Sequence, residues 1–399
     1  MTKLLDFKNN SVIAINQNNY TKEDNYKKVC YLDTDNITNN RINAFLKIDL
    51  TKEKLPSRAK RKCSINSIIY SSVRPNQRHF GIIKEIPKNF LVSTAFIVID
   101  IIDLKKLDPN YLYYYITQDK ITHYLQRIAE CGTSSYPSIT PLDFLNIKIK
   151  LYPLETQQKI ARTLSVLDQK IENNHKINEL LHKILELLYE QYFVRFDFLD
   201  ENNKPYQTSG GKMKFSKELN RLIPSGWSVR FLNHKIVSTY QPKTISKTLL
   251  NNSYSYSVYG GGGIIGRFTE YNHEQSEFII SCRGQCGISY LTLPKSWITG
   301  NAMVIRPTKS YTSKTYLYHT IKKYKLTNYI TGSVQPQITR QNLSTMPILI
   351  PKRKILNKWN NISSLLWNLI HNNMQATQTL TALRDFLLPL LLKQQVKPK

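Results

Sequence analysis

The sequence predicts an α+β fold in which two globular domains are separated by two long helices, with an internal pseudo-twofold repeat. Three observations support this prediction. A short motif recurs half a chain later, β-branched runs precede each copy, and a long apolar helical pattern follows each copy. Self-similarity at a fixed offset is the signature of a duplicated structural unit.

The repeated motif reads Gly-Thr-Ser-Ser-Tyr-Pro-Ser-Ile-Thr at residues 132–140 and Gly-Ser-Val-Gln-Pro-Gln-Ile-Thr at residues 332–339. Matching residues lie 199 positions apart in a chain of 399 residues. They are Pro137/Pro336, Ile139/Ile338 and Thr140/Thr339, followed in the helical stretches by Ile171/Ile370, Asn173/Asn372 and Asn174/Asn373. Two similar units present two similar surfaces, so we expect a long, repetitive partner that is bound at two places.

The first globular domain is predicted to be rich in strands. Residues 67–73 and 96–102 are short β-branched runs bounded by turn residues. One helix is expected over residues 111–129, with Pro109 at its first turn. Residues 278–350 repeat this order, with strands expected at 278–281 and 302–305 and a matching Tyr-Leu-Tyr that begins at Tyr316. The two domains are therefore predicted to be related to each other.

A long helix is predicted after each domain, because apolar residues recur at steps of three and four, the period of a coiled-coil seam. The first seam is expected at Ile160, Leu164, Leu167, Ile171, Ile177, Leu181, Ile184 and Leu188. The second is expected at Ile355, Trp359, Ile362, Leu366, Leu369, Asn373, Ala376, Leu380, Leu383, Leu387 and Leu390. We expect the two helices to bury these stripes against each other in an antiparallel coiled coil.

Asn174 and Asn373 occupy the same repeat position, and a polar residue within a seam often fixes register. Roughly 35–40 residues make a rod of about 50–60 Å, longer than one turn of duplex at about 34 Å. The helices are therefore interpreted as spacers, and ordinary core helices of one large domain are the alternative.

Four segments are expected along the chain. The first globular domain covers residues 1–153, and a central helical spacer covers 154–197. A polar, Gly- and Pro-bearing linker with the second domain covers 198–350, and a C-terminal helical spacer covers 351–399.

The charge balance predicts a polyanionic partner. Lys and Arg number 56 against 28 for Asp and Glu, a net charge of +28, which points most simply to nucleic acid. The alternative is a genome rich in A and T that inflates Lys, Asn and Ile, but such a bias does not explain why acidic residues are scarce.

The cysteines and the apolar runs predict a cytoplasmic protein without a metal. The five cysteines are odd in number, and Cys282 and Cys286 lack the second pair that a zinc site needs. Free thiols in a reducing cytosol are therefore expected. No run of about 18 apolar residues predicts a membrane span, and the N-terminus has no apolar signal core.

Five segments carry a family resemblance. They are residues 55–61 and 71–78, the Glu-Gln-Gln-like helix start at 153–160, the junction formed by 192–198 with 209–213, and residues 383–389. In this order and spacing, over nearly the whole chain, they resemble the specificity subunit of type I restriction–modification systems. The N-terminus departs from the pattern, because it lacks the Pro-x-Gly-Trp found at residues 224–227.

The resemblance implies that each domain is a target recognition domain that reads one half of a split double-stranded DNA target. It implies that the helices set the spacing and dock a pair of modification subunits, and that a restriction subunit completes the complex. It also implies that this chain has no catalytic residue and no cofactor of its own. S-adenosylmethionine would belong to the modification subunits, and ATP and Mg²⁺ to the restriction subunit.

The motifs agree with a non-catalytic chain. There is no Gly-x-x-x-x-Gly-Lys-Ser/Thr phosphate loop. Asp-Pro-Asn-Tyr at residues 108–111 is similar to the Asp-Pro-Pro-Tyr of amino methyltransferases, but it lacks the second proline and is interpreted as a helix start. The glycine run 260–263 is either a flexible turn or a loop that approaches DNA.

The candidate DNA contacts form two classes. Phosphate contact is expected from the charge run Arg58, Lys60, Arg61 and Lys62, which is otherwise a solvated face. Base contact is expected from Arg74, Asn76, Gln77 and Arg78, with repeat counterparts near Arg283 and Gln285, since Arg can address guanine and Asn or Gln adenine. The set is completed by Tyr259, Gly261, Gly262 and Arg267 at the glycine run and by Ser134, Ser135, Gln335 and Gln337 in the motif.

Several alternatives stay open. The repeated motif serves either groove contact or strand-to-loop geometry. The chain is either a specificity subunit or a standalone, non-catalytic nucleic-acid-binding protein whose partners are absent or inactive. A catalytic modification enzyme is a third class, opposed by the missing cofactor motif.

Overall fold

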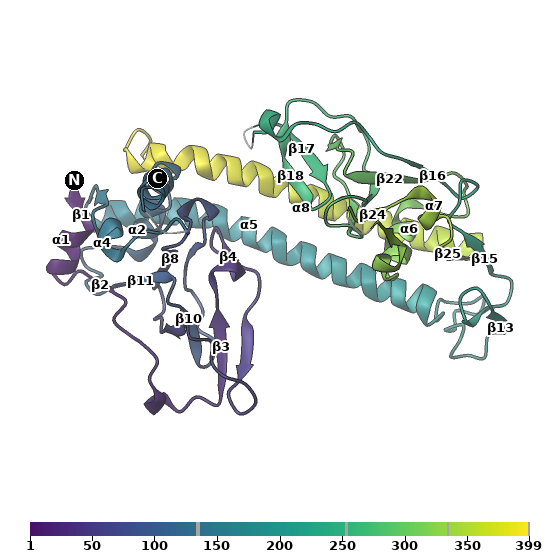
Figure 1. Ribbon diagram of the computed structural model, residues 1–399, viewed down its shortest axis with the longest axis horizontal. Coiled ribbons are helices and arrows are strands. Elements are labelled where there is room, and N and C mark those ends of the chain that lie inside the picture. Colours follow the sequence, from purple (N-terminus) through teal and green to yellow (C-terminus); the bar gives the residue numbers. More distant parts are fainter. Residues whose placement is uncertain (133–135, 252–253, 333–334, 398–399) are drawn as a thin grey trace. The chain divides into compact units, whose positions relative to one another are not determined.

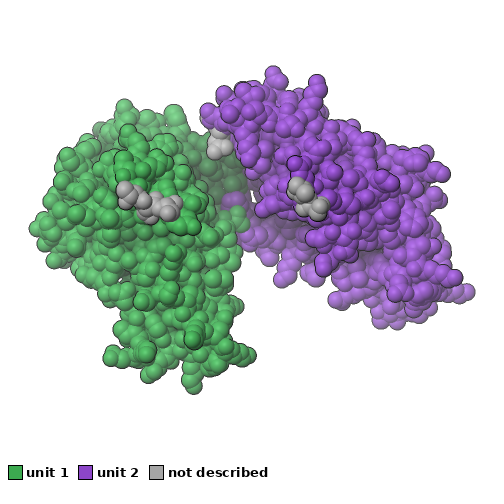
Figure 2. All heavy atoms as spheres, in the orientation of Figure 1, with its two compact units in different colours: residues 1–172, 377–399 green, residues 173–376 purple. Residues whose placement is uncertain are grey.

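The computed structural model describes residues 1–132, 136–251, 254–332 and 335–397, and the chain forms two compact units. Unit 1 comprises residues 1–172 and 377–399, and unit 2 comprises residues 173–376 (Figure 2). Each unit contains one β-rich domain and a part of each of two long helices (Figure 1). Each unit also has its own hydrophobic core.

The domain of unit 1 is built on two four-stranded sheets. One has the order β2 (Ile13–Ile15), β11 (Phe96–Ile101), β8 (Ile68–Ser71), β9 (Phe80–Ile82), and all its pairs are antiparallel. The other has the order β6 (Leu46–Asp49), β3 (Lys28–Leu32), β10 (Phe90–Ser93), β7 (Ala59–Arg61), and β3 runs parallel to β10. The strands predicted at 67–73 and 96–102 are confirmed as β8 and β11.

Shorter elements complete the domain of unit 1. They are the paired strands β1 (Thr2–Lys3) and β12 (Lys148–Ile149), the paired strands β4 (Ile37–Thr38) and β5 (Arg41–Ile42), and the helices α1 (Leu4–Asn9), α2 (Pro109–Ile116), α3 (Asp119–Glu130) and α4 (Pro141–Leu145).

The single helix predicted over residues 111–129 is wrong, because the chain forms α2 and α3 instead. The Asp108 carboxylate accepts a hydrogen bond from the Tyr111 amide at 2.8 Å, so Asp-Pro-Asn-Tyr is a helix start as predicted. The helix then ends where the Thr117 hydroxyl donates to the Tyr113 carbonyl at 2.8 Å and Gln118 adopts a non-helical ψ of 144°.

The domain of unit 2 repeats this topology. The sheet β16 (Val237–Tyr240), β22 (Ala302–Pro307), β19 (Phe278–Ser281), β20 (Ser289–Leu291) corresponds to β2-β11-β8-β9. The sheet β18 (Gly263–Phe268), β17 (Tyr256–Gly260), β21 (Trp297–Ile298) corresponds to β6-β3-β10 and includes the equivalent parallel pair. The predicted relationship between the two domains is therefore confirmed at the level of strand pairing.

The smaller elements of unit 2 follow the same plan. They are the pair β15 (Ser228–Phe231) and β25 (Pro347–Ile350), which matches β1 and β12, the hairpin β13 (Met213–Ser216) and β14 (Arg221–Pro224), the pair β23 (Ile330–Thr331) and β24 (Gln337–Ile338), and the helices α6 (Lys314–Lys322) and α7 (Arg340–Leu343). β1 is the counterpart of β15, which follows the Pro-x-Gly-Trp segment of the second domain. The first domain therefore forms the equivalent strand without such a segment.

The threonine and isoleucine of the repeated motif have structural roles. Thr140 caps α4 by accepting the Asp143 amide, and Thr339 caps α7 by accepting the Asn342 amide. Ile139 and Ile338 are buried in the two cores. These contacts favour strand-to-loop geometry as the shared job of the matching positions.

Two long helices, α5 (Leu154–Tyr189) and α8 (Arg353–Leu392), are packed together as predicted. In unit 2 the ring of Tyr189 lies 5.8 Å from that of Trp359, and His182 lies 5.1 Å from Trp367. Residue numbers thus fall on α5 as they rise on α8, so the pair is antiparallel. A π-helical turn, Glu190–Val194, follows α5.

The predicted seam is partly wrong. Ile184 and Leu369 were expected in it, but they are 44% and 51% exposed, whereas Trp367 and Ile370 are buried. The reason is that α8 packs on the domain of unit 2 as well as on α5: Trp367 also contacts Tyr318 of α6, at 5.4 Å between ring centroids. The buried stripe is consequently rotated away from the one expected of a helix that packs only on a second helix.

Asn373 forms a polar contact with Asn178 across the two helices. The Asn373 side-chain amide donates to the Asn178 oxygen at 3.0 Å, within the helix pair of unit 2. Both side chains are partly buried, so sliding one helix along the other would leave them without this hydrogen bond.

A double-mutant cycle is expected to measure this hydrogen bond. Asn178→Ala and Asn373→Ala should show a coupling free energy of unfolding of about 1 kcal/mol, the usual net value for a partly buried hydrogen bond. All four tryptophans lie in unit 2, so tryptophan fluorescence during urea unfolding reports on this unit. Pairing either variant with the exposed Asn372→Ala should give additive effects, and additivity of the first pair would contradict the role of the bond.

His319 of α6 is buried in unit 2 among aromatic rings. Its ring stacks on Tyr189 at 5.6 Å and meets Trp359 edge-on at 5.2 Å. Its Nε2 atom has no hydrogen-bond partner among the described residues. Burial, reinforced by the Lys322 ammonium, lowers the pKa of His319 from 6.5 to about 3.

Unit 2 is expected to lose stability as the pH falls below about 6.5. The unfolded chain binds a proton at His319 that the folded unit cannot bind, so at pH 5.5 this residue alone should lower the free energy of unfolding by about 1.4 kcal/mol relative to pH 8. Urea unfolding followed by tryptophan fluorescence across this pH range measures the slope. His319→Phe should flatten it, and the same substitution at the exposed His234 should not. An unchanged slope in His319→Phe would contradict the assignment.

Candidate nucleic-acid interface

In unit 1, the loop that follows β8, residues 72–78, lies against the repeated motif. The Arg74 amide donates to the Pro137 carbonyl at 2.8 Å, and the Arg74 guanidinium lies over the Tyr136 ring, 5.3 Å from its centroid. Arg74 has a φ of 47°, an uncommon conformation for a residue with a Cβ atom. The Arg74 side chain is exposed, and both the loop backbone and the contact with the Tyr136 ring restrain it. The sequence reasoning did not select Tyr136, although its place in the motif marks it.

The segment that carries Arg58 and Lys60 is linked to the start of this loop through Thr94 and Ala95. The Thr94 amide donates to the Arg58 carbonyl, and the neighbouring Ala95 carbonyl accepts the amide that begins loop 72–78, both at 2.8 Å. Both basic side chains are exposed. We call the surface formed by Arg58, Lys60, loop 72–78 and Tyr136 the first recognition end.

Arg61 and Lys62 are turned toward the domain instead. Arg61 is half-buried, and burial lowers the pKa of its guanidinium. The Lys62 ammonium pairs with Asp24 at 2.5 Å. The predicted charge run therefore splits into two exposed residues that can meet phosphate and two that support the fold.

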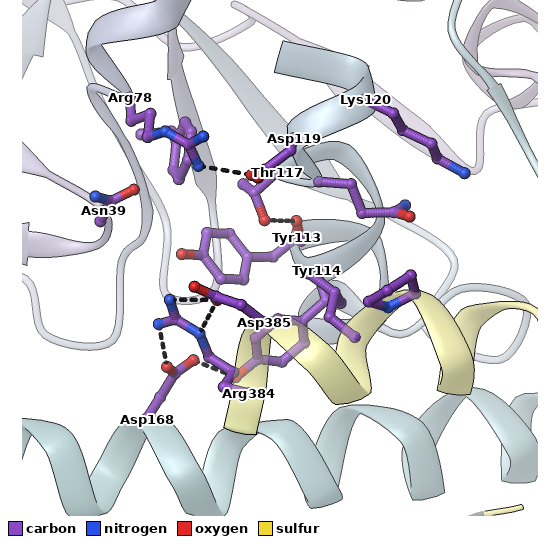
Figure 3. Close-up of a pocket in the computed structure, with 14 residues that line it drawn as sticks. Asn39, Arg78, Tyr113, Tyr114, Thr117, Asp119, Lys120, Asp168, Arg384 and Asp385 are labelled. Atoms are coloured by element: carbon purple, nitrogen blue, oxygen red, sulfur yellow. Dashed lines mark hydrogen bonds and ion pairs between the residues drawn. The ribbon is translucent and has the colours of Figure 1, made fainter. Parts of the chain in front are cut away.

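The predicted base-contacting residues at the end of the loop also differ from one another. Asn76 and Gln77 are exposed. The Arg78 guanidinium instead donates to Asp119 at the start of α3, at 2.9 Å, and is turned toward a cleft (Figure 3). The sequence has no local signal for this ion pair, because its members are 41 positions apart.

In unit 2, three segments that were predicted separately come together. Arg283 forms an isolated antiparallel bridge with Gln337 of the motif. A Cβ atom on Gly261 would lie 2.8 Å from the Arg283 carbonyl, and one on Gly262 would lie 3.6 Å from the Gln285 side-chain oxygen. The glycine run is therefore the turn that lets β17 and β18 approach the loop after β19. We call the surface of Gly261, Gly262, Arg283, Gln285 and Gln337 the second recognition end.

The loops after β8 and after β19 meet the repeated motif in the same way but differ in sequence. Val73 bridges Ser138 in unit 1 as Arg283 bridges Gln337 in unit 2. Arg283 thus corresponds to Val73, and Gly284 occupies the position of Arg74. Arg283 therefore lies one position before the equivalent of Arg74.

Tyr259 and Arg267 are both held by hydrogen bonds within their domain. Tyr259 is buried, its hydroxyl accepts the Leu293 amide at 3.0 Å, and burial raises its pKa to about 12. The Arg267 guanidinium donates to the carbonyls of Tyr254 and Ser255. Both residues therefore stabilise the β17–β18 hairpin and its surroundings.

The remaining candidates belong to the repeated motif. Gln335 is exposed, as is Gln337 of the second recognition end. Ser134 and Ser135 lie outside the described residues.

A cleft of about 280 Å³ in unit 1 lies between the first recognition end and the long helices (Figure 3). On its floor Tyr114 donates to Asp168 at 2.6 Å, and Arg384 donates to Asp168 and to Asp385, each at 2.8 Å. Burial alone would lower the pKa of Arg384, but the two carboxylates raise it above its usual value. Because these charges are mutually paired, the cluster serves to join α2, α5 and α8.

Two further findings concern metal sites and membrane spans in the part of the chain that the structure describes. Within residues 1–132, 136–251, 254–332 and 335–397, no group of three His, Cys, Asp or Glu side chains is placed to hold a metal ion. None of the helices described there has the length and apolar content that a membrane span requires.

One family model matches the chain in two segments. The family model for the type I restriction modification DNA specificity domain matches residues 4–183 and 224–380. The type I restriction enzyme HindI specificity subunit of Haemophilus influenzae is 23% identical over 93% of this chain and 95% of that protein. The type I restriction enzyme MjaIX specificity subunit of Methanocaldococcus jannaschii is 24% identical over 71% of this chain and 68% of that protein.

A solved structure supports the fold. The crystal structure of the type I restriction–modification system S subunit from M. genitalium aligns with a TM-score of 0.56 and 17% identity, over 98% of this chain and 99% of that chain. Each of the two segments matched by the family model contains one β-rich domain and part of the long helix that follows it.

Proposed function

Because this chain belongs to the type I restriction modification DNA specificity family, it is the DNA specificity subunit of such a system, and we propose that each β-rich domain reads one half of a bipartite DNA target. One observation carries the proposal. In both domains the loop after the equivalent strand, β8 or β19, bridges the repeated motif, yet the two loops carry different side chains. Shared topology with different side chains is what two readers of different short sequences require.

The side chains at the two ends fit base and phosphate contact. Arg74, Asn76 and Gln77 are exposed at the first end, and Arg283 and Gln285 are exposed at the second. Arg and amide side chains can make paired hydrogen bonds to guanine and adenine in the major groove. Arg58 and Lys60 beside the first end are suited to phosphate, and the net charge of +28 supports a polyanionic partner.

The long helices are proposed to set the distance between the half-sites and to dock a pair of modification subunits. Several apolar side chains point outward on them, among them Leu187 (59% exposed) and Phe386 (66% exposed). A helix that faced only water would place charged or polar residues there. The family is non-catalytic, so we assign S-adenosylmethionine to the modification subunits and ATP with Mg²⁺ to a restriction subunit.

Methylation of DNA by the reconstituted complex tests this function. The chain with its modification subunit and S-adenosylmethionine should methylate one bipartite target, and neither component alone should do so. Methylation by the chain alone would contradict the non-catalytic assignment. A chain that binds DNA but no modification subunit would instead be a standalone nucleic-acid-binding protein.

A further inference from the structure

The outer side of α8 lacks charge over an unusual length. Residues 359–383 contain no Asp, Glu, Lys or Arg, although these residues make up 21% of the chain. In unit 2 the exposed side of this stretch presents Asn361, Leu365, Asn368 and Leu369, which we call the uncharged face, and the half-buried Lys358 lies one turn before it. Leu365 and Leu369 are 66% and 51% exposed. Loss of charge with exposed apolar groups is typical of the core of a protein–protein interface.

The repeat places an equivalent face on α5 in unit 1. Subtracting the 199-residue offset from the uncharged face gives Arg162, Val166, Gln169 and Lys170, all of which are exposed. The amide of Asn368 has its counterpart in Gln169, and the aliphatic side chain of Leu365 has its counterpart in Val166. The differences are Arg162, which replaces Asn361, and Lys170, which replaces Leu369. We call this second set the charged counterpart.

We infer that one kind of protein partner binds both faces, and that it binds the uncharged face of unit 2 more tightly. Since the two faces share one amide and one aliphatic position at equivalent places on equivalent helices, a single partner surface fits both. That surface must be built from apolar and uncharged polar side chains, because the uncharged face offers no charge to pair with. The same lack of charge excludes DNA as its occupant.

The difference in affinity follows from two positions. Leu369 gains from leaving water, whereas the equivalent Lys170 must be desolvated or turned aside. The Arg162 guanidinium must likewise be desolvated or turned aside when the partner binds. This inference rests on the proposed function, under which the partner is the modification subunit. The first modification subunit then binds unit 2, and the second binds unit 1.

Titration of the full chain with purified modification subunit, followed by native mass spectrometry, tests the inference. Wild type should show two dissociation constants that differ by about tenfold or more, the effect of a leucine at an interface centre. Leu369→Lys should weaken the tighter constant toward the weaker one, and Lys170→Leu should tighten the weaker one. Leu369→Asn should have an intermediate effect, because it removes the apolar group without adding a charge. Ile65→Lys, at a position 63% exposed in the first domain, is the matched control and should change neither constant.

The other outcomes are distinct. Two equal constants, or constants that neither substitution changes, would overturn the inference and leave the proposed function standing. Absence of any complex with the modification subunit would overturn the proposed function itself. Self-association of the chain that Leu369→Lys abolishes would show that the occupant is a second copy, and would overturn the assignment of the partner.

Discussion

Inserting one heptad into both long helices is expected to lengthen the spacer between the two DNA half-sites by about three base pairs. Seven helical residues add about 10.5 Å, and each base pair adds about 3.4 Å along the duplex. The insertions belong between residues 172 and 173 of α5 and between residues 376 and 377 of α8, where the two units divide. They leave the contact of Asp168 with Arg384 in unit 1 and that of Asn178 with Asn373 in unit 2 intact.

Methylation sequencing of cells that carry this variant and its partner subunits measures the spacer. Both half-sites should keep their sequence, because neither recognition end is altered. A heptad nearly preserves the orientation of the helix faces, with a drift of about 20°. Insertion into α5 alone is the control, and it should abolish a defined target because it disrupts the antiparallel register. An unchanged spacer in the double variant would contradict the role of the helices as spacers.

Arg283→Ala is expected to relax specificity in only one half of the target. Arg283 is exposed beside Gln285 and Gln337 at the second recognition end, and it is placed by its bridge to the motif. Loss of a paired arginine–guanine contact reduces discrimination between bases by roughly 1–3 kcal/mol, a factor of about 5 to 150. Arg74→Ala should have the same effect on the other half.

Binding to a library of DNA targets that vary in one half-site separates reading from positioning. Lys60→Ala is the control for a phosphate contact, and it should weaken binding equally on every sequence and reduce the salt slope by about one. If Arg283→Ala behaved like Lys60→Ala, the arginine would contact phosphate rather than a base.

The elements with strong local signals were predictable from the sequence. The β-branched runs became β8 and β11, and Asp108 with Pro109 began α2 where helix-start chemistry placed it. The break between α2 and α3 was not predictable, because it depends on side-chain hydrogen bonds of Thr117 and Gln118 to the preceding turn.

The site was predictable only as a set of segments. The motif, the glycine run and the loop after β19 were each selected, and the fold brings them together. The direction of each side chain was not available from the sequence, since Arg267 satisfies nearby carbonyls and Arg78 pairs with a distant carboxylate. The helix seam was misplaced for a related reason. A heptad pattern describes one stripe, whereas α8 packs on both α5 and a globular domain.

The central claim is that this chain gives a type I restriction–modification complex a bipartite target, one half read by each domain. Sequencing of methylated bases in cells that express the chain with its modification subunits tests this claim most directly. We predict one methylated motif with two short specified parts separated by an unspecified spacer of fixed length. A continuous motif, or a methylation pattern that does not change when this chain is removed, would contradict it.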